Sequence, residues 1–243
     1  MRAIGLCLLW LIWGMIAGSG GAATVMYLRP EVFRAPPAIT IPLQKDTAVP
    51  KPNVDIRPFV VQVQGGIKDS TMVKLGHGVA WDETRIVTNA HVVKETPSAS
   101  AVKVLVNGKW ISATRVVWST SHDVALIEFS KPHGVPIAGM RGMPAVGTPV
   151  FYYNTSEKRV LTGAVVSASE VTIESEKFAT TSLPSRSGDS GGPVFDAGGN
   201  VLGLVTRAAV VTQGADPGSY MLGAQLVRQV MVTLVNYQPA AED

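Results

Sequence analysis

From residue 57 onward, short runs of alternating apolar and polar residues return about every ten residues, with turn-forming stretches between them. A period of two places successive side chains on opposite faces of a strand, so each run predicts a strand. Gly and β-branched residues are abundant and only 16% of the residues are charged, which favours an all-β domain over a helical or disordered chain. Strands at this spacing are typical of an all-β sandwich or barrel, and we expect two six-stranded antiparallel β-barrels.

The predicted first barrel occupies about residues 57–136 and the second about residues 147–222, with a turn-rich stretch between them. Strands of the first are expected at 59–64, 71–81, 85–88, 102–106, 110–118 and 124–129. Strands of the second are expected at 150–153, 160–168, 171–174, 193–195, 201–206 and 219–222. A C-terminal α-helix is expected at 223–237, because Leu226, Val230 and Leu234 recur at helical spacing.

The N-terminal segment, residues 1–28, is almost wholly apolar, and two interpretations of it remain open. The charge at Arg2 and a short apolar stretch that ends in small residues are typical of a cleavable signal peptide. The uncharged stretch nevertheless runs for 26 residues, 3–28, and a membrane-spanning helix needs roughly 20. Trp10, Trp13 and Tyr27 stand where aromatic residues meet membrane interfaces. We expect an N-terminal apolar helix, with a retained anchor favoured over a cleaved signal.

A Pro-rich segment, residues 29–54, follows this stretch and has little periodicity. Such a composition is typical of an extended, semi-rigid linker, so we expect the folded domain to occupy residues 55–243. The only cysteine, Cys7, precedes the linker, and this domain therefore forms no internal disulfide. No Cys/His pair has metal-ligand spacing, and we predict neither a metal nor a cofactor. The net charge of +3 comes without basic blocks and does not indicate nucleic-acid binding.

The motif Gly188-Asp189-Ser190-Gly191-Gly192-Pro193 predicts a nucleophile turn. Small residues on both sides leave one serine hydroxyl open and backbone N–H groups free to meet an oxyanion. The motif also satisfies the G-x-S-x-G elbow of α/β-hydrolases, whose histidine follows the serine along the chain. All four histidines here, His77, His91, His122 and His133, precede Ser190. The available order is therefore His, Asp, Ser.

Two earlier motifs supply a base and an acid in that order. His91 closes the apolar run 85–91, and Asp123 begins the apolar run 123–127. With Thr-x-Ala-His, Asp-Val-Ala-Leu-Ile and Gly-Asp-Ser-Gly-Gly-Pro all present, the chain resembles the trypsin/chymotrypsin-like serine proteases of bacterial or viral type. The resemblance implies that His91 is the general base, that Asp123 orients it, and that Ser190 is the nucleophile. The N–H groups of Gly188 and Ser190 would form the oxyanion hole.

The same resemblance implies a substrate pocket. No carboxylate stands at Pro184, the position at the base of the pocket, and Val205 replaces the His of glutamate-selective relatives, so a neutral apolar P1 side chain is expected. In zymogen-type relatives the residue at Asp189 pairs with a new α-amino group. No Ile-Val-Gly-Gly start precedes Val60, so a side-chain cation is expected in its place. The predicted pocket residues are Pro184, Ser185, Val205, Thr206, Arg207, Ala208 and Gly218.

We expect a serine endopeptidase that acts on proteins or peptides through an acyl-enzyme, anchored in a membrane or exported to a periplasmic or extracellular location. Two alternatives remain: a viral protease that processes its own polyprotein, and a catalytically silent trypsin-like binding module. Asn154-Thr155-Ser156 would be a glycosylation site only in the lumen of a eukaryotic compartment.

Overall fold

The computed structural model describes residues 49–237 apart from 143, 174–175 and 209–217. The predicted N-terminal helix and most of the predicted Pro-rich linker lie outside these residues. Within the part that is described, no helix is both long enough and apolar enough to cross a membrane.

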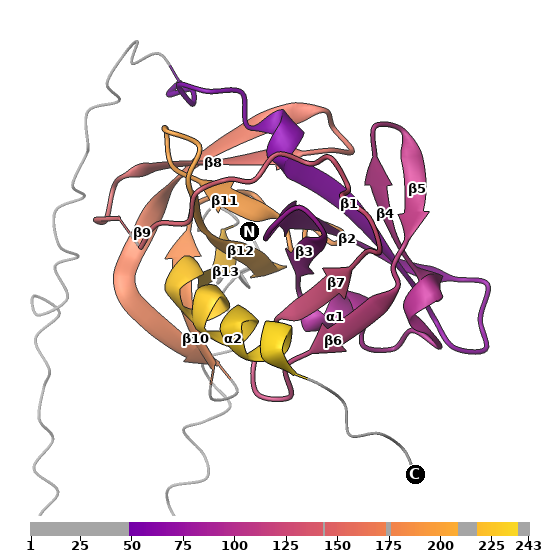
Figure 1. The fold of residues 1–243 in the computed structure, drawn as a ribbon. Helices are drawn as coiled ribbons and strands as arrows, with labels where there is room; N and C mark the ends of the chain where they lie inside the picture. Colours follow the sequence, from indigo (N-terminus) through magenta and orange to yellow (C-terminus); the bar gives the residue numbers. More distant parts are fainter. Residues whose placement is uncertain (1–48, 143, 174–175, 209–217, 238–243) are drawn as a thin grey trace, which may run out of the picture. The chain divides into compact units, whose positions relative to one another are not determined.

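The first half of the described chain forms an antiparallel seven-stranded sheet in the order β5-β4-β1-β2-β3-β7-β6 (Figure 1). A four-residue helix, α1 (Ala90–Val93), follows β3, and short 3-10 turns precede β1 and β4. The strands are β1 (Val60–Gly66), β2 (Val73–Ala80), β3 (Arg85–Thr88), β4 (Val102–Val106), β5 (Lys109–Ser112), β6 (Arg115–Trp118) and β7 (Ala125–Glu128).

The second half forms a closed six-stranded barrel in the order β10-β13-β12-β11-β8-β9. The chain then enters α2 (Ala224–Asn236), which packs on β12 and β13 of the barrel and on β7 of the first sheet. The strands of the barrel are β8 (Pro149–Asn154), β9 (Arg159–Ile173), β10 (Glu176–Thr181), β11 (Pro193–Phe195), β12 (Val201–Ala208) and β13 (Ser219–Gly223).

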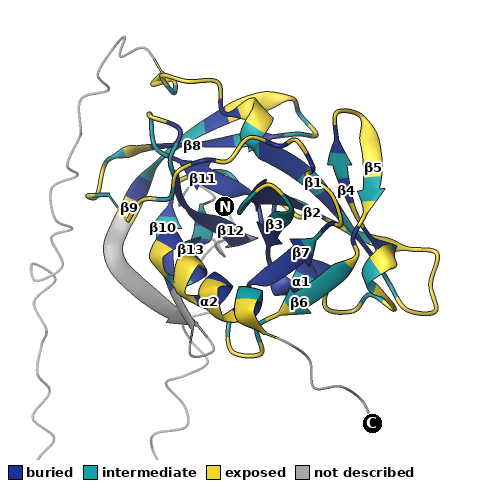
Figure 2. Ribbon diagram, in the orientation of Figure 1, coloured by how far each residue is buried: buried dark blue, intermediate teal, exposed yellow. Residues whose placement is uncertain are grey.

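One hydrophobic cluster joins the two sheets and the helix. Val87 and Leu126 reach it from the first sheet, Phe195 and Leu204 from the barrel, and Met231 from α2. The helix is amphipathic, with its buried residues on one side and an exposed face toward solvent (Figure 2). Burial of this shared surface stabilises the two sheets against each other, so side chains at their junction are held in fixed relation.

The prediction of an all-β fold with two antiparallel units and a C-terminal helix is confirmed. The predicted first barrel is a half-barrel of seven strands in place of six, because residues 110–118 do not form one strand. The N–H of Ala113 donates to Val102 O on one side of the sheet, and the N–H of Thr114 donates to Glu128 O on the other. The chain thus leaves β4 and joins β7 within two residues, which makes β5 and β6 separate strands.

The second barrel has the predicted number of strands but different ones. The predicted strands 160–168 and 171–174 are one continuous strand, β9, which pairs first with β8 and then with β10. The sequence prediction missed β10 because Phe178 and Ala179 are its only apolar residues, so the segment shows no alternation.

Candidate functional site

His91 lies on the first turn of α1, immediately after β3, rather than at the end of a strand. Its Nδ1 is 2.7 Å from Oδ2 of Asp123, and its backbone N–H donates to Oδ1 of the same carboxylate at 2.9 Å. The amide of Asn89 donates to the backbone carbonyl of Asp123 at 2.8 Å, which ties the two segments together. Because a carboxylate only accepts hydrogen bonds, Nδ1 carries the proton and Nε2 is left as an acceptor.

Asp123 is held as a carboxylate by donors around it. Its side chain is 17% exposed, whereas that of His91 is 37% exposed. Burial alone would raise the pKa of Asp123, but the hydrogen bonds and charge of His91 and the hydroxyl of Thr206 outweigh it, so the pKa lies below its usual value. The Thr206 hydroxyl donates to Oδ2 at 2.7 Å.

Ser190 lies in a tight turn that glycine makes possible. Gly188 and Gly191 have φ angles of +97° and +81°, a region that disfavours other residues. A Cβ on Gly191 would lie 2.3 Å from the carbonyl oxygen of His77 and 2.3 Å from the hydroxyl oxygen of Thr88. The turn therefore packs directly against β2 and β3 of the first sheet.

Thr206 connects this turn to the histidine–carboxylate pair. The Ser190 hydroxyl donates to the backbone carbonyl of Thr206 at 3.3 Å, while the Thr206 side chain binds Asp123. Gly76 provides a second link, since a Cβ there would lie 2.8 Å from both Ser190 O and Cγ2 of Val92, the residue after His91. The structure thus brings the three predicted residues, His91, Asp123 and Ser190, into one cluster.

Among the described residues, no hydrogen bond joins the Ser190 hydroxyl to the His91 ring. The Oγ of a serine can move between staggered rotamers about the Cα–Cβ bond, and its hydroxyl hydrogen can turn toward a different acceptor. Such bonds are often long or absent in unliganded enzymes and form only when substrate is bound.

The backbone N–H groups of Gly188 and Ser190 donate to no acceptor among the residues that the structure describes. Their neighbours differ, since Asp189 N donates to Arg186 O and Gly191 N donates to Val205 O. Gly188 and Ser190 are both half-buried, and the role of their N–H groups as oxyanion donors stays a prediction.

The predicted substrate pocket remains a prediction. Pro184 is partly exposed, Ser185 is buried, and Val205 packs in the core of the barrel. Gly218 directly precedes β13, which is paired with β12 so that Ser219 and Tyr220 lie opposite Ala208 and Arg207. The side chains of Arg207 and Ala208 are not among those that the structure describes.

Sequence reasoning missed a group of buried polar side chains behind the serine turn. The Asp189 carboxylate accepts hydrogen bonds from the hydroxyl of Tyr152 at 3.0 Å and from the amide of Asn154 at 3.1 Å. No ion pair with Asp189 is found in the described part of the chain, where its side-chain partners are the neutral donors Tyr152 and Asn154. Asn154 is buried, its amide nitrogen donates to Asp189, and its amide oxygen accepts from the backbone N–H of Glu157. Glycosylation of this side chain is therefore incompatible with the fold.

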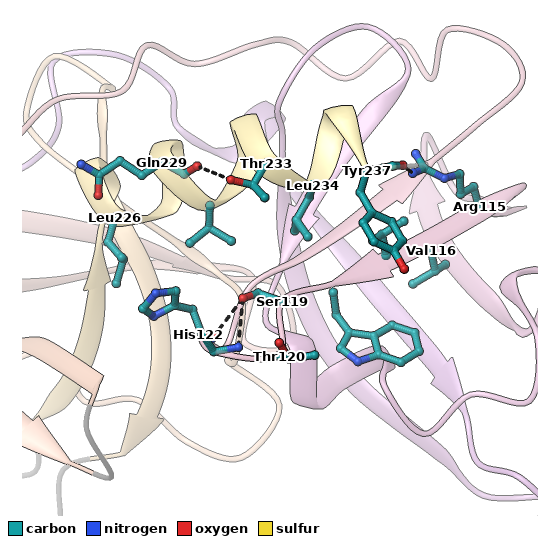
Figure 3. Close-up of a pocket in the computed structure, with 14 residues that line it drawn as sticks. Arg115, Val116, Ser119, Thr120, His122, Leu226, Gln229, Thr233, Leu234 and Tyr237 are labelled. Atoms are coloured by element: carbon teal, nitrogen blue, oxygen red, sulfur yellow. Dashed lines mark hydrogen bonds between the residues drawn. The ribbon is translucent and has the colours of Figure 1, made fainter. Parts of the chain in front are cut away.

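A groove of about 780 Å³ runs between β6 and α2 and reaches His122, the residue before Asp123 (Figure 3). Its floor and walls are mainly apolar and aromatic, with Trp118, Leu226, Leu234 and Tyr237 among the lining residues. The backbone N–H of His122 donates to the hydroxyl of Ser119 at 3.1 Å, which fixes the loop at this end of the groove.

Two antiparallel β units with a shared core, and a serine in a tight glycine turn next to a histidine–carboxylate pair, define the class of β-type serine peptidases. The family model described as "Trypsin-like peptidase domain" matches residues 76–204, which is more than half of the chain. The chain belongs to this trypsin-like peptidase family.

Several bacterial proteins are similar to the chain. Serine protease Rv3671c of Mycobacterium tuberculosis is 25% identical over 213 residues, 82% of this chain and 52% of that protein. The periplasmic serine endoprotease DegP of Escherichia coli is 27% identical over 190 residues, 71% of this chain and 38% of that protein. The chain thus spans about half the length, or less, of these relatives.

Solved structures share the fold. The crystal structure of the active form of the Rv3671c protease has a TM-score of 0.65 at 24% identity, covering 84% of this chain and 97% of that one. A variant of the HtrA-type protease AlgW, solved with a tripeptide, has a TM-score of 0.62 at 18% identity, covering 76% of this chain and 64% of that one.

Proposed function

We propose that the chain is a serine endopeptidase whose catalytic triad is His91, Asp123 and Ser190. The observation that carries the proposal is the double contact of Thr206, whose side chain binds Asp123 and whose carbonyl binds Ser190. The 2.7 Å contact between His91 and Asp123 also supports the proposed grouping of base, acid and nucleophile. Family membership supports the same reaction.

In the proposed reaction, rotation of the Ser190 side chain brings its hydroxyl to Nε2 of His91. This nitrogen takes the proton as the serine oxygen attacks the peptide carbonyl carbon, and Asp123 stabilises the imidazolium that results. The N–H groups of Gly188 and Ser190 bind the oxyanion, and one such donor contributes roughly 3 kcal/mol to the barrier reduction. His91 then gives the proton to the leaving amine, and water hydrolyses the acyl-enzyme by the reverse sequence.

The proposed substrates are proteins or peptides with a neutral, apolar P1 residue, and the pocket would be formed by Pro184, Ser185, residues 205–208 and Gly218. The proposed location is a membrane surface or an exported compartment, with residues 1–28 as signal or anchor and residues 29–54 as a linker. The name of the DegP relative as a periplasmic endoprotease supports an exported location.

The proposal is tested by labelling the purified full-length chain with a fluorophosphonate and locating the adduct by mass spectrometry, together with cleavage of a peptide library. We expect one adduct, on Ser190, and peptide cleavage that Ser190→Ala abolishes without loss of fold. Ser156→Ala removes an exposed serine hydroxyl outside the proposed site. It serves as the control and should behave as wild type. A folded, unlabelled and inactive wild type would instead indicate the silent binding module.

A further inference from the structure

Asp189 is a buried carboxylate with neutral partners. It is 3% exposed, and its Oδ1 accepts from Tyr152 and Asn154 while its Oδ2 accepts from the backbone N–H of Arg186 at 2.7 Å. A buried charge is costly unless hydrogen bonds replace its lost hydration, so these three donors are needed for the folded position of Asp189. Through the bond to Arg186, the carboxylate also closes the loop 186–190 on itself.

The direction of the hydrogen bonds around Tyr152 follows from the carboxylate. Since Asp189 can only accept, the Tyr152 hydroxyl donates to it, and the Tyr152 oxygen is then an acceptor for Nδ1 of His77 at 3.3 Å. His77 therefore carries its proton on Nδ1. Its Nε2, 2.5 Å from the hydroxyl of Thr155, accepts from that group, and Thr155 accepts from the amide of Gln62 at 2.8 Å.

The four hydrogen bonds of this series can all be made with His77 neutral. Burial lowers the pKa of His77, against the opposing charge of Asp189, so the neutral form is the stable one. Burial and the neighbouring Asp189 charge also raise the pKa of Tyr152, which keeps its hydroxyl as a donor. The series runs without a break from Gln62 in β1 to the loop that carries Ser190.

The Tyr152 ring packs against the backbone that follows this loop. A Cβ on Gly192, two residues after Ser190, would lie 2.4 Å from Cε2 of Tyr152, so a side chain there would clash with the ring. The loop bears the unpaired N–H groups of Gly188 and Ser190. The direction of the Ser190 N–H depends on the peptide plane between Asp189 and Ser190, and that of the Gly188 N–H on the plane between Ser187 and Gly188. Both planes lie in the loop that the Asp189 carboxylate closes through its bond to the Arg186 N–H.

We infer that Tyr152 and Asn154, with Tyr152 oriented by His77, are positioning residues that hold the loop 186–190 in the shape that binds the oxyanion. Within the described residues, they and the backbone N–H of Arg186 are the hydrogen-bond donors to the Asp189 carboxylate. The inference rests on the proposed peptidase function, because it concerns the same oxyanion site.

The test compares Tyr152→Phe with Tyr153→Phe in the full-length chain. Both changes remove one hydroxyl from neighbouring residues of β8, but only Tyr152 donates to Asp189. We expect Tyr152→Phe to lower kcat by about tenfold to a hundredfold, somewhat less than the loss of an oxyanion donor itself, with KM nearly unchanged. Binding of a peptide boronic acid, whose tetrahedral adduct places an oxygen in the oxyanion site, should weaken in parallel. Tyr153→Phe should match wild type in both measurements.

A double-mutant cycle with Asp189→Asn separates positioning from a general loss of stability. If Tyr152 acts through Asp189, Tyr152→Phe should cost little more activity once Asp189 is changed, so the two effects should not add. Wild-type kcat in Tyr152→Phe, or losses that simply add in the double variant, would overturn the inference. Should Tyr152→Phe fail to fold, Asn154→Ala is measured in its place against the same criteria.

Parallel assays of wild type and Ser190→Ala distinguish this inference from the proposed function. If wild-type cleavage depends on Ser190 but Tyr152→Phe and Asn154→Ala are both fully active, the positioning role alone is wrong. If wild-type cleavage does not depend on Ser190, the proposed function and the positioning role both fail.

Discussion

Thr206 contacts both halves of the proposed site, although the sequence pattern predicted it only as part of the substrate pocket. Its hydroxyl donates to Asp123, and its carbonyl accepts from Ser190. Asp123 is therefore oriented by donors from α1 and from β12, on opposite sides of the junction between the sheets. The tautomer of His91 depends on this carboxylate, and a change of a single atom at Asp123 should have a large effect on catalysis.

Asp123→Asn should lower kcat by roughly 10⁴-fold, the size of the effect when the orienting carboxylate of such a triad becomes an amide. The amide would donate to Nδ1 of His91, so that Nε2 carries the proton and can no longer accept one from Ser190. The measurement is steady-state hydrolysis of a peptide ester or amide, with far-UV circular dichroism as a check of the fold. Thr206→Ser keeps the hydroxyl donor and serves as the control. Activity of Asp123→Asn near that of wild type would show that another acid orients the histidine.

At the scale of elements, the proposed site depends on loops that glycine allows to approach strands closely. The serine turn between residues 186 and 192 contacts β2 through the bond from His77 N to Ser190 O at 2.8 Å, and β12 through the bond from Gly191 N to Val205 O. These bonds connect the barrel to the first sheet at the position where α1 presents His91. The absence of a side chain at Gly191 is therefore required by the packing of the turn against β2 and β3, as well as by the turn itself.

Gly191→Ala should destabilise the fold by about 3 kcal/mol or more and abolish activity, since it combines a strained positive φ with a backbone clash. Gly108→Ala is a matched control, because Gly108 also has a positive φ, +76°, but a Cβ there meets no atom within 4 Å. That variant should lose only about 1 kcal/mol from backbone strain and stay active. The measurement is the free energy of unfolding in urea, with hydrolysis assayed in the same preparations. Equal losses in the two variants would show that the close contact at Gly191 is unimportant.

At the scale of the whole molecule, the parts that sequence predicted well are those whose signals are local. The strands β3, β4 and β11 have the predicted bounds because each is a short apolar run between turn residues. His91, Asp123 and Ser190 could be proposed from sequence because each lies in a short motif, and their order along the chain differs from that of an α/β-hydrolase. The structure brings the three residues together, with the histidine on α1 after strand β3.

The features that sequence did not predict depend on register between distant segments. Tyr152 and Asn154 face Asp189 because β8 pairs with β11 through Phe151 and Phe195 and alternates its side chains about that pair. The break at Ala113 and Thr114 likewise depends on partners on two different strands. Neither the pairing of β8 with β11 nor the break at Ala113 and Thr114 changes the local alternation of apolar and polar residues, so neither could be predicted from it.

The free energy of unfolding should fall in two stages as pH decreases. Burial places the folded-state pKa of His77 below 6.5, its ordinary value, so the unfolded state takes up a proton first and stability is lost from about pH 6.5 downward. Asp123 has a folded-state pKa below 3.8, so its contribution is present above that pH and is lost as pH falls through the folded value. Urea unfolding across pH 2–8, with wild type, His77→Gln and Asp123→Asn compared, follows both stages. Persistence of the first stage in His77→Gln would assign it to another group.

The proposed site and its supporting core lie in a part of the chain that is compact by itself, so removal of the N-terminal segment should leave the enzyme intact. Residues 48–243 form one unit, and the buried hydrophobic residues of that unit extend from Ile56 to Leu234. A chain that begins at residue 48 should therefore keep wild-type kcat/KM and lose no more than about 0.5 kcal/mol of stability, the scale of a surface change.

The same truncation tests the proposed membrane anchor. The full-length chain should sediment with phospholipid vesicles, and the truncated chain should stay in the supernatant. Full-length Leu8→Arg/Leu11→Arg serves as the control for length, because charges within the apolar stretch oppose insertion while every residue of the compact unit is kept. This double variant should stay in the supernatant, like the truncated chain, and should remain active. If the truncated chain is inactive although folded, the N-terminal segment is part of the working enzyme and is more than an anchor.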